Sequence, residues 1–136
     1  MSFTVYAGRY PNGGADEELP PDDYEYPRLG ARDEVIARIR EIVPFADFTD
    51  SDPIKVAVDP MWVDILPIGD DDAIDMIEFE ASGDEEAVAL VAEVMIAFEL
   101  QGHTDIGEFF NPRTDVLPSY TEKWRSLRAR LLAGSS

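Results

Sequence analysis

Side chains able to do acid, base or metal chemistry are abundant in this sequence, but few are spaced in a recognisable way. The chain has one histidine, His103, and a histidine acts as a general base or a metal ligand only when partner side chains gather around it. His103 directly follows Gly102, a residue type that commonly ends a helix, and an imidazole there interacts favourably with the last carbonyl groups. We therefore expect His103 to be a helix-end residue.

Two groups of aspartates could offer oxygen ligands to a hard cation. Residues 70–72 are all aspartates in a predicted hairpin turn, and Asp47, Asp50 and Asp52 crowd another loop. Neither group has the alternating ligands, central glycine and terminal glutamate of a calcium loop. With 29 acidic residues in the chain, a pair of carboxylates can be found anywhere and does not identify an acid–base site. We expect no catalytic residue, no metal site, no cofactor and no enzymatic activity.

A long segment without helix or strand periodicity, residues 9–31, is typical of a displayed surface. Its stretch LPPDDYEYPRLG (19–30) combines prolines, which reduce the entropy lost on ordering, with tyrosine rings, which are favoured at interfaces. No basic residue lies between Tyr10 and Pro27. An equally supported alternative is that both tyrosines fold back onto the sheet and the acids only solvate the loop. The candidate partner-binding residues are Asp16, Glu17, Glu18, Asp22, Asp23, Tyr24, Glu25 and Tyr26.

The charge of the chain narrows the class of partner. The sequence has 29 acidic and 11 basic residues and a formal net charge of -18, whereas small domains carry a magnitude of about 2 to 8. Such a field repels nucleic acid and anionic membranes and attracts basic protein surfaces. The alternative explanation of this high carboxylate content is an organism whose proteins are acidic in general. The cations of the last predicted helix are expected to pair with the chain's own carboxylates or a helix end; they are Lys123, Arg125, Arg128 and Arg130.

Length and composition favour one soluble domain. A chain of 136 residues without cysteine can bury a single core without disulfides. The start of the sequence lacks a basic region followed by a long apolar run, and no stretch approaches the roughly 20 apolar residues that span a bilayer. We expect a cytoplasmic protein that does not bind membranes.

Hydrophobic periodicity predicts the secondary structure of the first two thirds of the chain. Residues 2–8 alternate like a strand, and residues 32–44 have an apolar face at helical spacing that stops at a proline. Residues 54–58, 62–68 and 73–81 alternate again and are separated by short turns, of which DPM (59–61) is the first. These last three segments are expected to form a meander.

Two further helices are predicted near the C-terminus. The segment 82–102 begins with a capping box, Ser82 and Glu85, and its apolar run from 87 to 100 predicts that Leu90, Val94 and Phe98 are buried. Residues 104–110 are expected to form the last strand. The segment 118–133 has a capping box at Ser119 and Glu122. Its apolar stripe consists of Tyr120, Trp124, Leu127 and Leu131.

This order of elements predicts a single α+β domain over residues 1–136. We expect an antiparallel or mixed sheet of four to five strands with two main helices on one face, a variant of the ferredoxin-like fold, plus a C-terminal amphipathic helix. The fold alone does not choose a function.

The same elements carry a resemblance. The segments MSFTVY, ARDEVIARIREI, IKVAVDPMWVDILPIGDDDAIDMIEFEA and TDIGEFF, together with the apolar helix between the last two, resemble small acidic bacterial proteins, some of which look like immunity proteins of polymorphic toxin systems. The resemblance covers residues 1–6 and about 32–110, so the acidic segment 9–31 and the basic last helix lie outside it. It implies a small protein that binds and blocks a toxin domain.

Three classes of function remain open. The first is an acidic protein-binding module, an immunity-like inhibitor that blocks a basic toxin or enzyme surface; it needs no catalytic residues and uses the charge directly. The second is a homo-oligomeric regulatory or structural subunit that dimerises through an exposed sheet edge or the last helix; for the protein in general we expect a monomer or a homodimer. The third is a small-ligand sensor or enzyme, which a closed apolar pocket with converging polar groups would favour.

Overall fold

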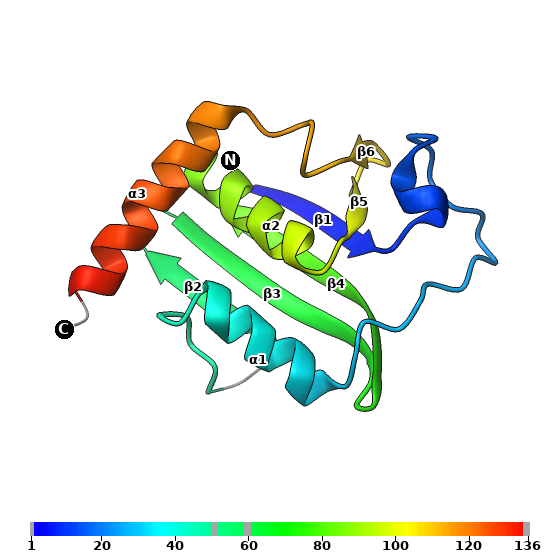
Figure 1. Ribbon diagram of the computed structural model, residues 1–136, viewed down its shortest axis with the longest axis horizontal. Coiled ribbons are helices and arrows are strands. Elements are labelled where there is room, and N and C mark those ends of the chain that lie inside the picture. Colours follow the sequence, from blue (N-terminus) through cyan, green and yellow to red (C-terminus); the bar gives the residue numbers. More distant parts are fainter. Residues whose placement is uncertain (1, 50–51, 59–60, 135–136) are drawn as a thin grey trace.

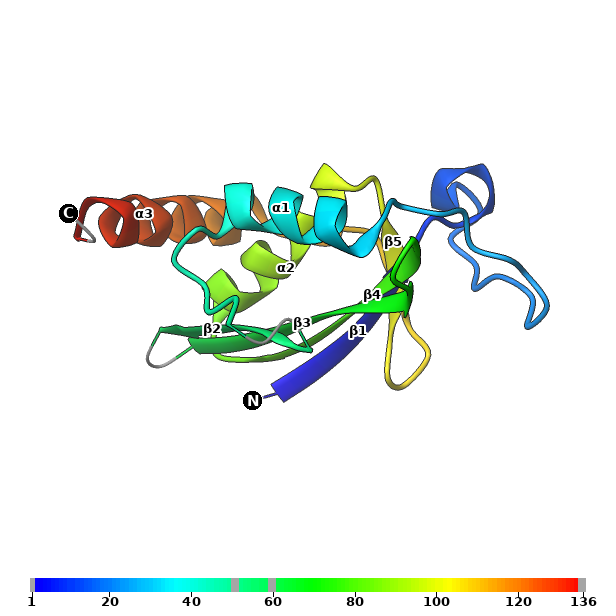
Figure 2. The same cartoon turned by 90° about the horizontal axis from the view of Figure 1, so that it is seen from below.

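A computed structural model describes residues 2–49, 52–58 and 61–134 (Figure 1). In these residues an antiparallel sheet of six strands has the order β2-β3-β4-β1-β5-β6. Three α-helices lie on one face of this sheet, and its other face is uncovered (Figure 2). The strands are β1 (Ser2–Gly8), β2 (Ile54–Val58), β3 (Met61–Asp70), β4 (Ala73–Ser82), β5 (Gln101–Thr104) and β6 (Phe109–Phe110), and the helices are a 3-10 turn (Pro11–Gly14), α1 (Arg32–Ile42), α2 (Glu85–Ala97) and α3 (Pro118–Gly134).

The α+β class and the antiparallel sheet are confirmed, whereas the expected four to five strands and two helices on one face were wrong. The extra strand arises because the strand predicted at 104–110 is a hairpin, β5 and β6. Gly107 has a φ of 83° and its N–H donates to the carbonyl of Thr104 at 2.9 Å, so the chain reverses there. The turn predicted at 59–61 falls mainly on residues 59–60, which lie outside the described residues.

The core lies between the sheet and α2. Alternate residues of β3 and β4 point toward the helices and are buried, as their period of two predicts. Leu90 and Val94 are fully buried and Phe98 is 5% exposed, which confirms the predicted burial of the apolar helix.

The predicted ends of this helix were wrong. Ser82 is the last residue of β4, where it pairs with Ser2 and Trp62, so the helix begins three residues later. It ends at Ala97 because Glu99 adopts a φ of 58° and turns the chain into β5. Gly102 is therefore a strand residue and not a helix cap.

Helix α3 packs on α2 through its predicted stripe. Trp124 is 1% exposed, and Tyr120, Leu127 and Leu131 are partly buried. The helix begins at Pro118, so Ser119 lies inside the first turn and is not the cap.

Arginines from distant segments cap the C-terminal ends of α1 and α2. Arg38 and Arg9 donate to the carbonyls of Ala97 and Phe98 at the end of α2, at 2.8 and 3.1 Å. Arg128 donates from Nε to the carbonyl of Ile42, at 2.7 Å, at the end of α1. A positive charge is favourable at this end of a helix dipole.

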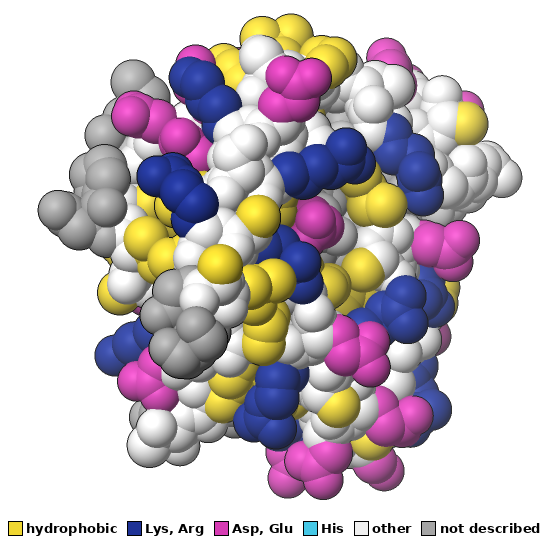
Figure 3. Space-filling model, turned by 60° about the vertical axis from the view of Figure 1, so that its left-hand side comes forward, with side chains coloured by type: hydrophobic (Ala, Val, Ile, Leu, Met, Phe, Trp, Pro, Cys, Tyr) yellow, Lys and Arg dark blue, Asp and Glu magenta, His cyan; other side chains and the backbone are white. Residues whose placement is uncertain are grey.

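Two cations of α3 therefore bind other helices of the same chain. Lys123 forms an ion pair with Glu85 at the start of α2, and the partly buried Arg128 donates to the last carbonyls of α1. Figure 3, which looks toward the α3 side, shows Lys and Arg side chains spread among carboxylates and apolar groups. The predicted pairing to the chain's own carboxylates and helix ends is thus seen for Lys123 and Arg128, whereas Arg125 and Arg130 are exposed.

Replacing Arg128 by methionine, which keeps the stem but removes the donors, is expected to lower the free energy of unfolding by about 1–2 kcal/mol. The loss follows because the last carbonyls of α1 would no longer be bonded to α3. Urea unfolding followed by circular dichroism measures it, with Arg125→Met, at an exposed position of the same helix, as the matched control. Equal stability of the two variants would contradict the capping role.

Candidate functional site

The acidic segment predicted as a displayed surface projects from one end of the sheet (Figures 1 and 2). We call residues 15–29 the acidic loop. The loop leaves β1 through the 3-10 turn and is fastened at its far end to the β3–β4 hairpin, where Leu29 donates to the carbonyl of Ile74 at 2.7 Å and Ile74 donates to that of Gly30 at 2.9 Å. Both ends are thus held by the sheet.

The candidate residues divide into two groups in the structure. All six carboxylates of the loop are exposed, and none of them forms a salt bridge with a cation of the described chain. The two tyrosines are half-buried instead. The exposed carboxylates are Asp16, Glu17, Glu18, Asp22, Asp23 and Glu25.

Both tyrosine rings are turned toward the body of the protein. The hydroxyl of Tyr24 donates to the carbonyl of Arg9 at 2.8 Å, and its ring meets that of Tyr26 edge to face with centroids 5.0 Å apart. A Cβ atom on Gly8 would lie 2.6 Å from Cδ1 of Tyr26. Only glycine at this position therefore lets the Tyr26 ring lie on β1, and the rings hold the loop in place.

Tyr10 connects the two loop tyrosines to the sheet. It is 3% exposed, and its ring centroid lies 6.0 Å from that of Tyr26 and 5.8 Å from that of Phe109. Such contacts between aromatic rings contribute about 0.5–1.5 kcal/mol each beyond the buried area. We call this group the aromatic cluster; its members are Tyr6, Tyr10, Tyr24, Tyr26, His103 and Phe109.

The helix-end role expected for His103 was wrong, because the residue lies in β5. Its ring stacks on Tyr6 with centroids 5.4 Å apart, and its Nδ1 lies 2.6 Å from the hydroxyl of Tyr10. Burial lowers the pKa of His103, and the imidazole and the Tyr10 hydroxyl share a hydrogen bond. Burial, reinforced by Tyr26, raises the pKa of Tyr10 well above its usual value. The Tyr10 side chain is almost fully buried, and its hydroxyl bonds to His103 inside the protein. We therefore interpret the contact between Tyr10 and His103 as structural.

Each aspartate group has at least one member with a local side-chain contact. Asp47 accepts the N–H of Thr49 at 2.9 Å, which is the main reason that its pKa is lowered, and Asp71 pairs with Arg32 at 3.2 Å. Asp50 lies outside the described residues. In the ranges that the structure describes, no three histidine or carboxylate side chains lie together as a metal site would require.

A groove of about 710 Å³ lies between one side of α1 and the C-terminal end of α2. Three arginines and three glutamates line it, and two of the arginines donate to the carbonyls at the end of α2. The groove is wide open, so it is not the closed apolar pocket that would favour a small-ligand sensor or an enzyme. Its lining charges are Arg9, Arg38, Arg113, Glu34, Glu41 and Glu99.

The edges of the sheet offer little length for pairing with another chain. The backbone of Lys55, on edge strand β2, exchanges two hydrogen bonds with Asp47, at 2.7 and 3.2 Å. The other edge strand, β6, has two residues. These edges give no specific support to dimerisation by strand addition.

Comparison of the chain with protein-family models, with curated proteins and with solved structures finds no match. Among the helices that the structure describes, none is both long and apolar enough to cross a membrane.

The sequence alone did not identify Tyr10, His103, Phe109 and Gly8 as partners of the acidic loop. The spacing of Tyr6 and Tyr10 around the end of a predicted strand was the one local signal. Their contacts with residues about 90 positions away depend on β5 lying beside β1.

Proposed function

We infer that this protein is an acidic protein-binding module whose acidic loop engages a basic surface of another protein. The observation that carries the proposal is the loop itself, which presents six unpaired exposed carboxylates while two tyrosines and three prolines hold its backbone. A loop that is already ordered loses less entropy on binding, and unpaired carboxylates speed the encounter with a basic partner.

In its more specific form, the proposal is an immunity-like inhibitor that blocks a basic toxin or enzyme surface. The resemblance of the sequence to immunity proteins and the net charge of -18 support this form. An inhibitor acts by covering a surface, which requires no catalytic group of its own.

Neutralising the centre of the loop tests the proposal. The triple variant Asp22→Asn, Asp23→Asn, Glu25→Gln is expected to slow association with a basic partner by about tenfold at low salt and to flatten the dependence of the association rate on salt. The partner is first captured on the immobilised full chain and then purified, and its binding kinetics are measured at two or more salt concentrations.

A matched variant separates a local effect from a change of net charge. The changes Asp33→Asn, Glu99→Gln and Glu122→Gln remove the same charge from exposed positions outside the loop and are expected to leave the association rate within about twofold of the parent. If both triple variants slow association equally, the loop is not the interface and only the overall charge attracts the partner.

A further inference from the structure

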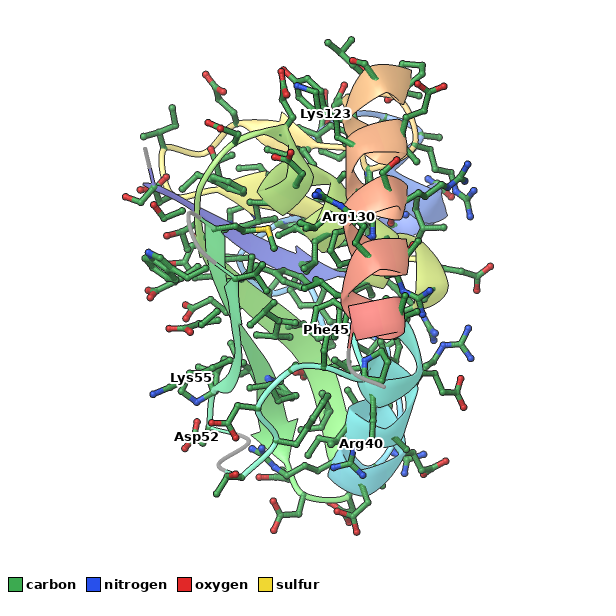
Figure 4. The ribbon with its side chains drawn as sticks, turned by 90° about the vertical axis from the view of Figure 1, so that its left-hand side faces the viewer. Arg40, Phe45, Asp52, Lys55, Lys123 and Arg130 are labelled. Carbon is green, nitrogen blue, oxygen red and sulfur yellow. The ribbon has the colours of Figure 1, made fainter. Side chains whose placement is uncertain are left out.

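The face of the sheet opposite the helices is uncovered. Figure 2 shows all three helices on one side of the strands, and Figure 4 shows Lys55 projecting to the other side. We call this second side the outer face. Trp62 and Ile68 on β3 are 40% and 36% exposed there, although they are large apolar side chains.

The strand register places apolar side chains and carboxylates next to one another on the outer face. Ile68 lies opposite Met76, and Leu66 lies two residues along β3 from Ile68. Trp62 lies toward the other end of β3, and Asp64 stands between it and Leu66 on the same side of the strand. Carboxylates therefore stand among the apolar side chains, with Glu78 opposite Leu66 and Glu80 opposite Asp64.

The acids of the outer face are crowded. Asp64 and Glu80 are direct cross-strand neighbours, an unfavourable arrangement for like charges. Burial, together with Glu80, raises the pKa of Glu78. Lys55 is the one lysine or arginine in the six described strands, and it forms no salt bridge with the Asp64 side chain opposite it. A cation supplied from outside would relieve this repulsion.

The acidic loop borders the outer face. Val5 and Ala7 of β1 point toward the helices and are buried, so the open position at Gly8 faces the same side as Tyr6. The ring of Tyr26 fills that position. The loop and the outer face therefore form one continuous surface.

We propose that the outer face is a docking surface for a basic protein segment that carries apolar side chains together with lysines or arginines. A second copy of this chain is a poor occupant, because it would bring Asp64, Glu78 and Glu80 against the same carboxylates. Apolar contacts with Trp62 and Ile68 would supply affinity, and the carboxylates would select a basic partner. The inference deepens the proposed function, on which it rests, by naming a second part of the interface.

Trp62 can report docking directly, because the other tryptophan, Trp124, is buried against the opposite side of the core. The probe is a synthetic amphipathic peptide with a leucine stripe flanked by lysines and no aromatic residue. Titrating it into the full chain is expected to shift the tryptophan emission to shorter wavelength with saturation, and Trp62→Phe should remove the shift. A peptide with glutamate in place of each lysine should not bind.

Two variants of the outer face test its contribution to affinity. Trp62→Ala, and the pair Asp64→Asn with Glu80→Gln, are each expected to weaken binding of the lysine peptide about tenfold, as measured by calorimetry. The matched controls are Ile106→Ala, an apolar residue that is 76% exposed in the β5–β6 turn, and Glu122→Gln on α3; both should bind like the parent.

The outcomes separate this inference from the proposed function. If the outer-face variants bind the lysine peptide like the parent while the loop variant does not, docking on the sheet is refuted and the loop proposal stands. If neither set weakens binding, both proposals fail. If the protein alone sediments as a dimer that Trp62→Ala dissociates, the outer face is occupied by a second copy and the inference is overturned.

Discussion

Truncating Phe98 to alanine should lower the free energy of unfolding by about 3–5 kcal/mol. The ring is 5% exposed and lies in the core cluster at the point where α2 ends. The guanidinium of Arg38 lies 5.6 Å above its centroid. The variant would lose the buried ring surface, leave a cavity beneath the end of the helix and remove this cation–π contact.

Chemical denaturation followed by circular dichroism measures the loss. The matched control is Phe98→Leu, which keeps most of the buried volume and is expected to cost less than about 1.5 kcal/mol. A Phe98→Ala variant within about 1 kcal/mol of the parent would show that the end of α2 is not part of the core.

Trp124→Ala should have an effect of similar size, about 3–5 kcal/mol. Among the α3 residues whose burial the structure describes, Trp124 is the one that is fully buried, and its ring lies 6.1 Å from that of Phe45. The remaining apolar residues of α3 are at most partly buried. Without the Trp124 ring, we therefore expect the helix to detach before the sheet unfolds. Hydrogen exchange in residues 118–134 should then speed up in the variant while exchange in β1, β3 and β4 changes less.

Trp124→Phe separates packing from hydrogen bonding at this position. The indole N–H of Trp124 is buried and has no hydrogen-bond partner in the described part of the chain. Phenylalanine removes that unsatisfied donor, which itself costs about 1–3 kcal/mol, while it loses only part of the ring volume. The Phe variant should therefore be clearly more stable than the Ala variant; if the two are equally unstable, ring packing does not hold α3.

The sequence was informative where a single element carries the signal. The period of two in β1, β3 and β4 and the apolar run of α2 predicted which side chains are buried, because a strand or a helix with one covered face repeats its apolar residues at its own period. The same reasoning identified the acidic loop as lacking that periodicity.

Local signals failed where a distant contact competed with them. The Ser82 capping box was outweighed by pairing of Ser82 with β1 and β3, and the strand expected at 104–110 was divided by the turn at Gly107. His103 was assigned to a helix end because its sequence neighbour is a glycine, whereas its contacts come from Tyr6 and Tyr10 across two strands.

The sequence by itself determined the α+β class, the buried side of each long element and the acidic character of the protein. The tertiary structure decided that the tyrosines of the acidic loop lie on β1, that arginines cap helices from other segments, and that Trp62 and its neighbours stay uncovered. The physical reason is that periodicity records which side of an element is apolar, whereas the group that covers that side is set by contacts between residues far apart in the chain.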